Sequence, residues 1–268
     1  MNQFFSVKRF SLLVLKHWAD NKKRYGLSVF AFIGLLIVWF VFVLLIDDNE
    51  FMDSDIQEIT YFFSLFIVGT FYASQYFRDL GSRAKGINFL LVPASAFEKL
   101  LCSLLYTVVF FFIVFSAVFY LVDFLLVVVS NAIGGGHYEV TNVFKVVFVR
   151  FGGDMAVQLL FIFFSIQSVF LLGSVYFEKY GFIKTIISGF VAFFIVICLL
   201  FLLYDFLLPR GQYQEGFLTS YRVYVDGVND HLVEIPSWIG KTFGILIMYA
   251  VAPFLWIVSY YRLKEKQV

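Results

Sequence analysis

Charged side chains are scarce in this chain. They make up 15% of its 268 residues and leave a formal net charge of only +1, whereas about a quarter of the residues of a soluble domain are charged. Hydrophobic residues reach 61% and aromatic residues 22%. One soluble core cannot bury that much apolar surface, so the composition predicts a protein that uses the lipid bilayer as its solvent. It excludes a disordered chain, a disulfide-rich scaffold and a nucleic-acid-binding protein.

Cysteine and histidine are also rare, and the motifs of catalysis and cofactor binding are missing. Cys102 and Cys198 lie inside apolar runs, so we expect both to be free thiols. The three His are far apart and form no pattern typical of a metal site. The glycine run 134–136 is followed by His137, not by the Lys that a phosphate-binding loop needs. We therefore expect no catalytic, cofactor-binding or metal-binding residue here, and no enzyme activity in this chain.

Long apolar stretches predict a single transmembrane domain. A helix needs about 20 apolar residues to cross the hydrocarbon core, and six stretches meet this requirement: 27–46, 59–77, 100–129, 155–177, 183–208 and 239–261. The strands of a membrane barrel would instead alternate over short segments. The predicted fold class is therefore an all-α integral membrane protein with six transmembrane helices.

Lys and Arg are concentrated in alternate connections between these spans. Six of them precede the first span, the acidic connection 47–58 has none, and the segment 78–99 is basic again. Basic residues mark the cytoplasmic side of a membrane protein. We therefore expect both termini in the cytoplasm, and a multi-pass protein of the cell (inner or plasma) membrane.

Residues 1–25 have the pattern of an amphipathic helix. Its apolar face would contain Phe4, Val7, Val14, Leu15 and Trp18, and its polar face Arg9, Lys16 and Asp20. Such a segment suits a helix that lies in the cytoplasmic interface close to anionic headgroups. The alternative is a simple anchoring tail.

Small residues and one proline predict local features of the spans. Gly69 and Ala73 in the second span, and Gly240 and Gly244 in the last, have the four-residue spacing that allows helices to approach closely. Pro253 is expected to kink the last helix.

Two carboxylates, Asp123 and Asp205, lie within predicted spans. An ionisable residue at membrane depth is a candidate for function. Counted from the cytoplasmic ends, however, the two residues lie about 35 and 33 Å along their helices. We therefore expect interfacial carboxylates that reach water on the outer side, with proton coupling or substrate contact as the alternative.

Two outer connections, 130–154 and 209–238, are long. In the second, residues 221–225 alternate in polarity and are followed by Asp226-Gly227. This pattern favours a short strand that ends in a turn.

The connection 78–99 is the most informative segment of the chain. Its middle part, 87–92, is apolar although its flanks are basic. Pro93 would end a helix, and Ser95 with Glu98 forms a predicted capping box that starts the third span. A short apolar element between basic flanks is a candidate docking surface for a cytosolic partner.

This segment resembles the permease subunits of type-2 ATP-binding-cassette (ABC) transporters. The matching residues are Asp79, Gly86, Leu90-Leu91, Pro93, Ser95 and Lys99. The resemblance extends to the N-terminal amphipathic helix, the six-span layout and the basic end of the chain at 260–266. It departs where the family often has Gly-Thr, because Ile87 follows Gly86 here.

The resemblance implies a subunit that has no ATPase of its own. Such permeases act as dimers, with a second copy or a paralogue, and bind two separate ATPase subunits that hold ATP and Mg. The segment after the second span would be the coupling helix. The resemblance implies that Arg83, Lys85, Asn88, Phe89, Leu90 and Leu91 touch the ATPase, and that Pro93, Ser95 and Glu98 set the geometry.

The sequence therefore predicts the permease subunit of an ABC exporter that moves an amphipathic or apolar molecule across the membrane. Two alternatives remain open, a non-transporting scaffold subunit of a larger envelope complex and a secondary transporter. A secondary transporter should show paired repeats with broken helices, and the sequence shows neither.

Overall fold

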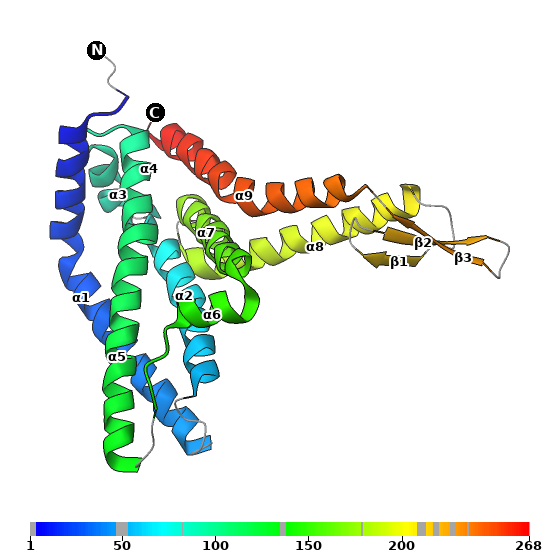
Figure 1. The fold of residues 1–268 in the computed structure, drawn as a ribbon. Helices are drawn as coiled ribbons and strands as arrows, with labels where there is room; N and C mark the ends of the chain where they lie inside the picture. The colour runs from blue at the N-terminus through cyan, green and yellow to red at the C-terminus, as the bar shows by residue number, and fades with distance from the viewer. Residues whose placement is uncertain are drawn as a thin grey trace.

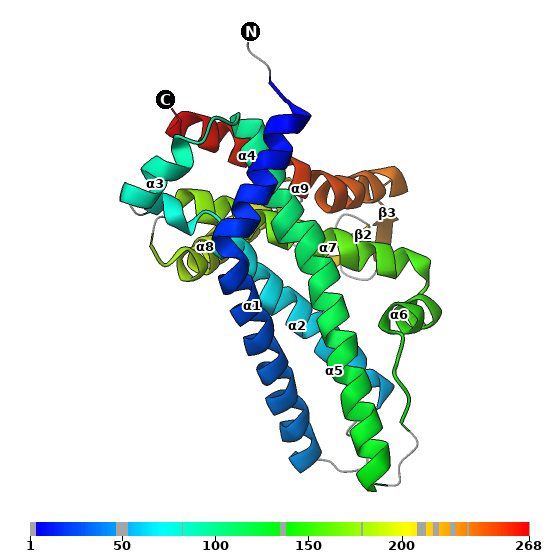
Figure 2. The same ribbon diagram turned by 90° about the vertical axis from the view of Figure 1, so that its left-hand side faces the viewer.

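The computed structural model describes residues 4–46, 53–81, 83–134, 138–177, 179–207, 213–216, 220–225, 229–234 and 236–267. Helices dominate it, and a small three-stranded sheet lies between the last two long helices in sequence order. Figures 1 and 2 show α1, α2 and α5 running together through the body of the molecule, while α8 and α9 extend to one side. Both termini lie at the same end, near α3 and α4.

Five of the described helical runs are long and apolar enough to cross a membrane. They are Val7–Val43, Ser54–Gln75, Ala96–Ala132, Met155–Tyr176 and Gly181–Leu202. These five overlap the first five predicted spans, and a helical chain with five such helices has the character of a multi-pass membrane protein. The sixth predicted span is helical in α9 (Ser237–Lys266) but is not among the five, so the count of six stays a prediction. Figure 1 shows that α9, which contains Pro253, changes direction along its length.

The first helix is longer than expected. α1 (Val7–Ile46) is one helix of 40 residues, about 60 Å at 1.5 Å per residue, roughly twice the hydrocarbon thickness. The prediction of a separate amphipathic helix over 1–25 is therefore wrong in its boundary, because residues 7–25 continue into the first span without a break. No proline interrupts this stretch, so nothing local stops the helix.

The third predicted span begins earlier and ends later than expected. It combines α4 (Ala96–Leu104), a π-helical segment η2 (Leu105–Phe110) and α5 (Phe111–Gly134) in one continuous run. Single π turns inside α-helices are rare and disturb the regular hydrogen-bond ladder.

The largest core cluster is aromatic and centres on Tyr61 of α2 (Ser54–Gln75). The Tyr61 ring meets Phe119 edge-to-face at a centroid distance of 5.0 Å, and its hydroxyl lies 2.8 Å from Ser116 Oγ. Edge-to-face packing adds to the burial of the rings, and the hydroxyl finds a partner inside the protein. On the far side of the cluster, Phe32 of α1 stacks on Phe115 at 4.9 Å.

A short helix covers the N-terminal end of α2. α6 (Val143–Phe151) lies within the segment predicted as an outer loop, and Asn142 caps it. The Gln57 side chain binds the carbonyl of Glu139 at 3.1 Å and the amide of Thr141 at 2.8 Å. Arg150 pairs with Asp55 at 2.5 Å, and this hydrogen bond raises the pKa of the Arg150 guanidinium.

α7 (Gly153–Tyr176) packs on α2, α8 (Gly181–Leu207) and α9. Gly69 in α2 lies so close to α7 that a Cβ atom would be 3.1 Å from the Phe163 ring, and Ala73 is fully buried. The predicted small-residue contact in the second span is thus confirmed. A Cβ at Gly244, in contrast, would touch nothing within 4 Å.

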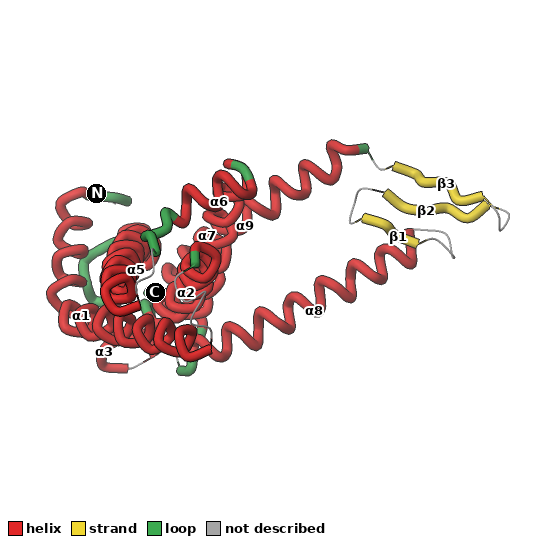
Figure 3. Tube along the Cα trace, turned by 60° about the horizontal axis from the view of Figure 1, so that its bottom comes forward, coloured by secondary structure: helices red, strands yellow, loops and turns green. Residues whose placement is uncertain are grey.

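The connection after α8, predicted as an outer loop, contains an antiparallel sheet. β1 (Tyr213–Gly216), β2 (Ser220–Val225) and β3 (Asn229–Glu234) lie in sequence order. The strand predicted over 221–225 is confirmed, whereas the predicted turn at Asp226-Gly227 lies outside the described residues. Figure 3 shows the sheet beyond the far ends of α8 and α9.

The close approach of α7 and α8 at Gly173 gives a stability prediction. A Cβ at Gly173 would lie 2.8 Å from Thr185 Cβ, which is too close without a shift of one helix. We expect Gly173→Ala to lower stability by about 1–3 kcal/mol through overpacking, measured as a lower thermal midpoint in detergent.

Gly189→Ala is the matched control, because a Cβ at Gly189 of the same helix pair meets nothing within 4 Å. It should leave the midpoint unchanged or raise it. Equal midpoints for the two variants would contradict the close approach.

Candidate functional site

The predicted docking segment folds into a short helix that rests on the turn before it. η1 (Arg78–Gly81) is followed by α3 (Arg83–Leu90). Gly86 is buried in α3, and a Cβ there would lie 3.1 Å from the Leu80 carbonyl oxygen. The absence of a side chain at Gly86 therefore allows α3 to lie directly against η1.

The outer face of α3 is apolar. Ile87 and Leu91 are 56% and 73% exposed, and Asn88 beside them is also exposed. The Leu91 amide donates to the Ile87 carbonyl at 2.9 Å, so the helical turn continues as far as Leu91. Residues four apart on a helix share one face, so Ile87 and Leu91 form a continuous exposed apolar pair.

The inner face of α3 is anchored by a buried lysine. Lys99 of α4 is 1% exposed, and its Nζ donates to the Leu90 carbonyl at 3.1 Å. The same ammonium lies 5.3 Å from the centroid of the Phe89 ring, and Phe89 meets Phe77 edge-to-face at 5.9 Å. A buried ammonium needs such partners to offset its lost hydration. Phe89 and the Leu90 backbone therefore hold α3 against the rest of the protein.

The start of α4 carries the predicted capping box. The Glu98 amide donates to Ser95 Oγ at 3.1 Å, and the Ser95 amide donates to Glu98 Oε2 at 2.8 Å. This confirms the local role predicted for both residues.

Glu98 also binds the start of the chain, which the capping motif does not predict. Its Oε1 accepts from the Ser6 amide at 2.7 Å and from Arg9 Nη2 at 3.0 Å. Ser95 Oγ donates to the Phe4 carbonyl at 2.8 Å. The Glu98 side chain is 0% exposed, so its negative charge is balanced by these donors within the protein. The beginning of α1 is thereby fixed to the beginning of α4.

The structure divides the predicted docking residues into groups. Asn88, Leu91 and Pro93 are exposed, whereas Phe89 and Leu90 are half-buried. Arg83 and Lys85 lie in α3, but their side chains are outside what the structure describes. Ile87 was not among the predicted docking residues. Its position four residues before Leu91 is the sequence signal that could have identified it.

Of the two carboxylates in predicted spans, the structure describes the surroundings of Asp123 but not of Asp205. Asp123 is 0% exposed in α5, and neither carboxylate oxygen has a hydrogen-bond partner among the described residues. The prediction that it reaches water is therefore wrong, because its side of α5 faces the core with Phe119 and Val122. Asp205 lies in α8, and its side chain is outside the described part of the structure.

Within the described residues, no three His, Cys, Asp or Glu side chains lie together in a way that could hold a metal ion. Comparison with models of protein families, with characterised proteins and with solved structures finds no match to this chain. Any assignment of function therefore depends on the sequence and on the geometry of the α3 segment.

The contacts of Glu98 predict how the N-terminus is held. We expect Glu98→Gln to weaken the bonds to Ser6 and Arg9, because a neutral amide has one acceptor oxygen and no charge. Hydrogen bonds to a charged group contribute about 1.5–3 kcal/mol. Hydrogen exchange at the amides of residues 6–10 should therefore become faster, and the thermal midpoint should fall.

Glu265→Gln is the control, since Glu265 is 63% exposed and pairs with Arg262 within one helix. It should change neither quantity, because exposed ion pairs contribute little. Unchanged exchange in Glu98→Gln would show that Glu98 does not hold the start of α1.

Proposed function

We propose that this chain is the permease subunit of an ABC exporter, with α3 as the element that docks on a separate ATPase. In this proposal the chain holds no ATP site, acts as a dimer with a second copy or a paralogue, and obtains its energy from ATP and Mg bound in the partner. Its substrate would be an amphipathic or apolar molecule. The proposal includes α9 as the sixth span. It also includes a location in the inner or plasma membrane, with both termini in the cytoplasm.

The observation that carries this proposal is the construction of α3. Ile87 and Leu91 expose apolar surface on a helix whose other face is fixed by Phe89, Gly86 and the bond from Lys99. An element that transmits force must present a surface to its partner and be rigidly joined to its own domain. Exposed apolar residues at the membrane-distal end of a helical protein are typical of a protein–protein contact.

The charge distribution supports the side on which α3 would act. Lys and Arg are concentrated before the first span and in the segment 78–99, and the termini lie at the same end of the molecule as α3 and α4. By the positive-inside rule this end faces the cytoplasm, where an ATPase could reach the exposed pair.

The exposed pair gives the direct test. Ile87→Asp combined with Leu91→Asp should abolish association with the ATPase, because each buried apolar side chain contributes about 1.5–3 kcal/mol to a contact. We expect more than about a tenfold loss of ATPase when the tagged chain is purified from its native membrane in mild detergent and the bound proteins are identified by mass spectrometry. The wild-type chain should retain a stoichiometric ABC ATPase.

Lys264→Glu is the control, since it changes the charge by the same amount at an exposed position near the end of α9. It should retain the ATPase, and both variants should insert into the membrane in wild-type amounts. Leu90 is less suitable for this test because it is half-buried. Recovery of the wild-type chain without any ATPase, under conditions that preserve a known ABC complex, would overturn the proposal in favour of a scaffold or a secondary transporter.

A further inference from the structure

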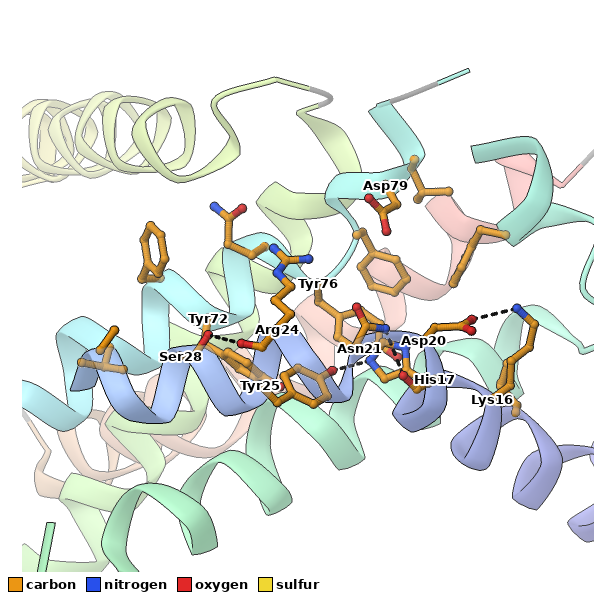
Figure 4. A pocket seen from close by; sticks show the side chains of 18 of the residues that line it. Lys16, His17, Asp20, Asn21, Arg24, Tyr25, Ser28, Tyr72, Tyr76 and Asp79 are labelled. Carbon is orange, nitrogen blue, oxygen red and sulfur yellow. Dashed lines mark hydrogen bonds and ion pairs between the residues drawn. The ribbon is translucent and has the colours of Figure 1, made fainter. Parts of the chain in front are cut away.

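A groove of about 750 Å³ lies between α1 and α2, and η1 and α3 close one end of it. Figure 4 shows side chains from both walls of this groove. Its volume falls within the range of about 300–1,000 Å³ that is typical of ligand sites.

Both walls of the groove change from charged or polar residues to apolar residues along the same direction. On α1 the lining changes from Lys16, Asp20 and Arg24 to Phe32 and Leu35. On the opposite wall it changes from Asp79 and Gln75 to Phe71 and Val68, because α2 runs back along α1 (Figure 2). The charged side chains of the groove therefore lie at one end, where Leu13, Leu80, Phe89 and Val92 also contribute apolar surface, and the other end is apolar. This arrangement fits an amphipathic occupant.

The polar end lies at the level of the lipid headgroups. Arg24 stands just before the apolar stretch 27–46, and Leu35 follows it by eleven residues, about 16 Å along the helix. One leaflet of the hydrocarbon core is about 15 Å thick. The apolar part of the groove thus has the length of one leaflet.

Arg24 is a cation at this end for which the described residues supply no hydrogen-bond or ion-pair partner. Lys16 forms an ion pair with Asp20 at 2.9 Å, whereas the Arg24 guanidinium forms no hydrogen bond or ion pair with any residue that the structure describes. Figure 4 shows Arg24 extending from α1 into the groove. A guanidinium can bind a phosphate through two parallel hydrogen bonds.

The apolar end is open toward the surrounding bilayer. Leu35 and Phe71 are 57% and 53% exposed, whereas Phe32 between the helices is 8% exposed and forms the floor. An acyl chain can enter such an opening sideways, and a water-soluble anion would gain nothing from these apolar walls.

We propose that this groove binds one phospholipid, with its phosphate on the Arg24 guanidinium and an acyl chain along Phe32, Leu35 and Phe71. The phosphate supplies a negative charge that pairs with the Arg24 guanidinium. The acyl chain covers apolar surface that the protein leaves exposed. This site does not depend on the proposed transport function.

The test compares two lipids and two variants of the full chain by native mass spectrometry. Dioleoylphosphatidylethanolamine should bind as one retained molecule, and dioleoylglycerol, which has the same chains without phosphate, should bind about tenfold more weakly, as expected for the loss of a charge-assisted hydrogen bond. Arg24→Gln should lower phospholipid binding by a similar factor and leave dioleoylglycerol binding unchanged. Lys23→Gln is the matched control, because Lys23 is exposed on the same helix but does not line the groove.

Equal losses in Arg24→Gln and Lys23→Gln, or equal binding of the two lipids, would overturn the proposal. Displacement of the phospholipid by inorganic phosphate would also overturn it, by showing a site for small anions. A phospholipid with a photoreactive acyl chain adds a readout of position. It should label segments 31–35 and 68–71, and labelling confined to α8 would place the lipid elsewhere.

Discussion

The buried carboxylate of Glu98 fixes the geometry on which both candidate sites depend. It joins Ser6 to the start of α4 across 92 positions of sequence and caps α4 at the same time. A carboxylate taken out of water costs several kcal/mol unless its acceptor positions are filled, and here Ser6, Arg9 and Ser95 fill them. The position of α1 beside α4 follows from this arrangement. The position of α1 in turn sets the groove wall that α1 forms and the place of Arg24 along that wall.

Helices in a bilayer cannot rely on the hydrophobic effect to find one another, because lipid tails are as apolar as their side chains. The described contacts between helices are accordingly specific. Gly69 and Gly173 allow α7 to approach α2 and α8, and the Tyr61 hydroxyl meets Ser116 within an aromatic cluster. The helices also differ in burial, since 50% of the apolar stretch of α2 is buried and only 6% of that of α8. α2 is thus the central helix, and α8 leaves its apolar side chains to the bilayer.

Sequence alone predicted the features that depend on neighbours in the chain. The five long apolar helices follow from apolar length, the capping box from Ser95 and Glu98 three residues apart, and the strand over 221–225 from alternation. Features set by distant residues could not be predicted in the same way. Counting residues along a helix gives the depth of Asp123 but not the side of α5 on which it lies, and that side faces the core. Leu90, and not Ile87, was predicted as a docking residue from the resemblance. The rotation of α3 about its own axis, which the sequence does not give, decides that Ile87 faces outward.

The groove and α3, the proposed docking helix, share residues, so they cannot move independently. Phe89 lines the groove and also holds α3 through Lys99 and Phe77, and Asn88 lies both at the groove and beside the exposed pair. A displacement of α3 relative to α1 therefore changes the shape of the groove. If an occupant of the groove binds more tightly when α3 is in one position than in another, it favours that position of α3. A partner that moves α3 then changes the affinity of the groove for its occupant, by the same factor by which the occupant changes the affinity for the partner. The Glu98 contacts keep α1 fixed to α4 during such a movement, so the change is confined to the wall that α3 forms.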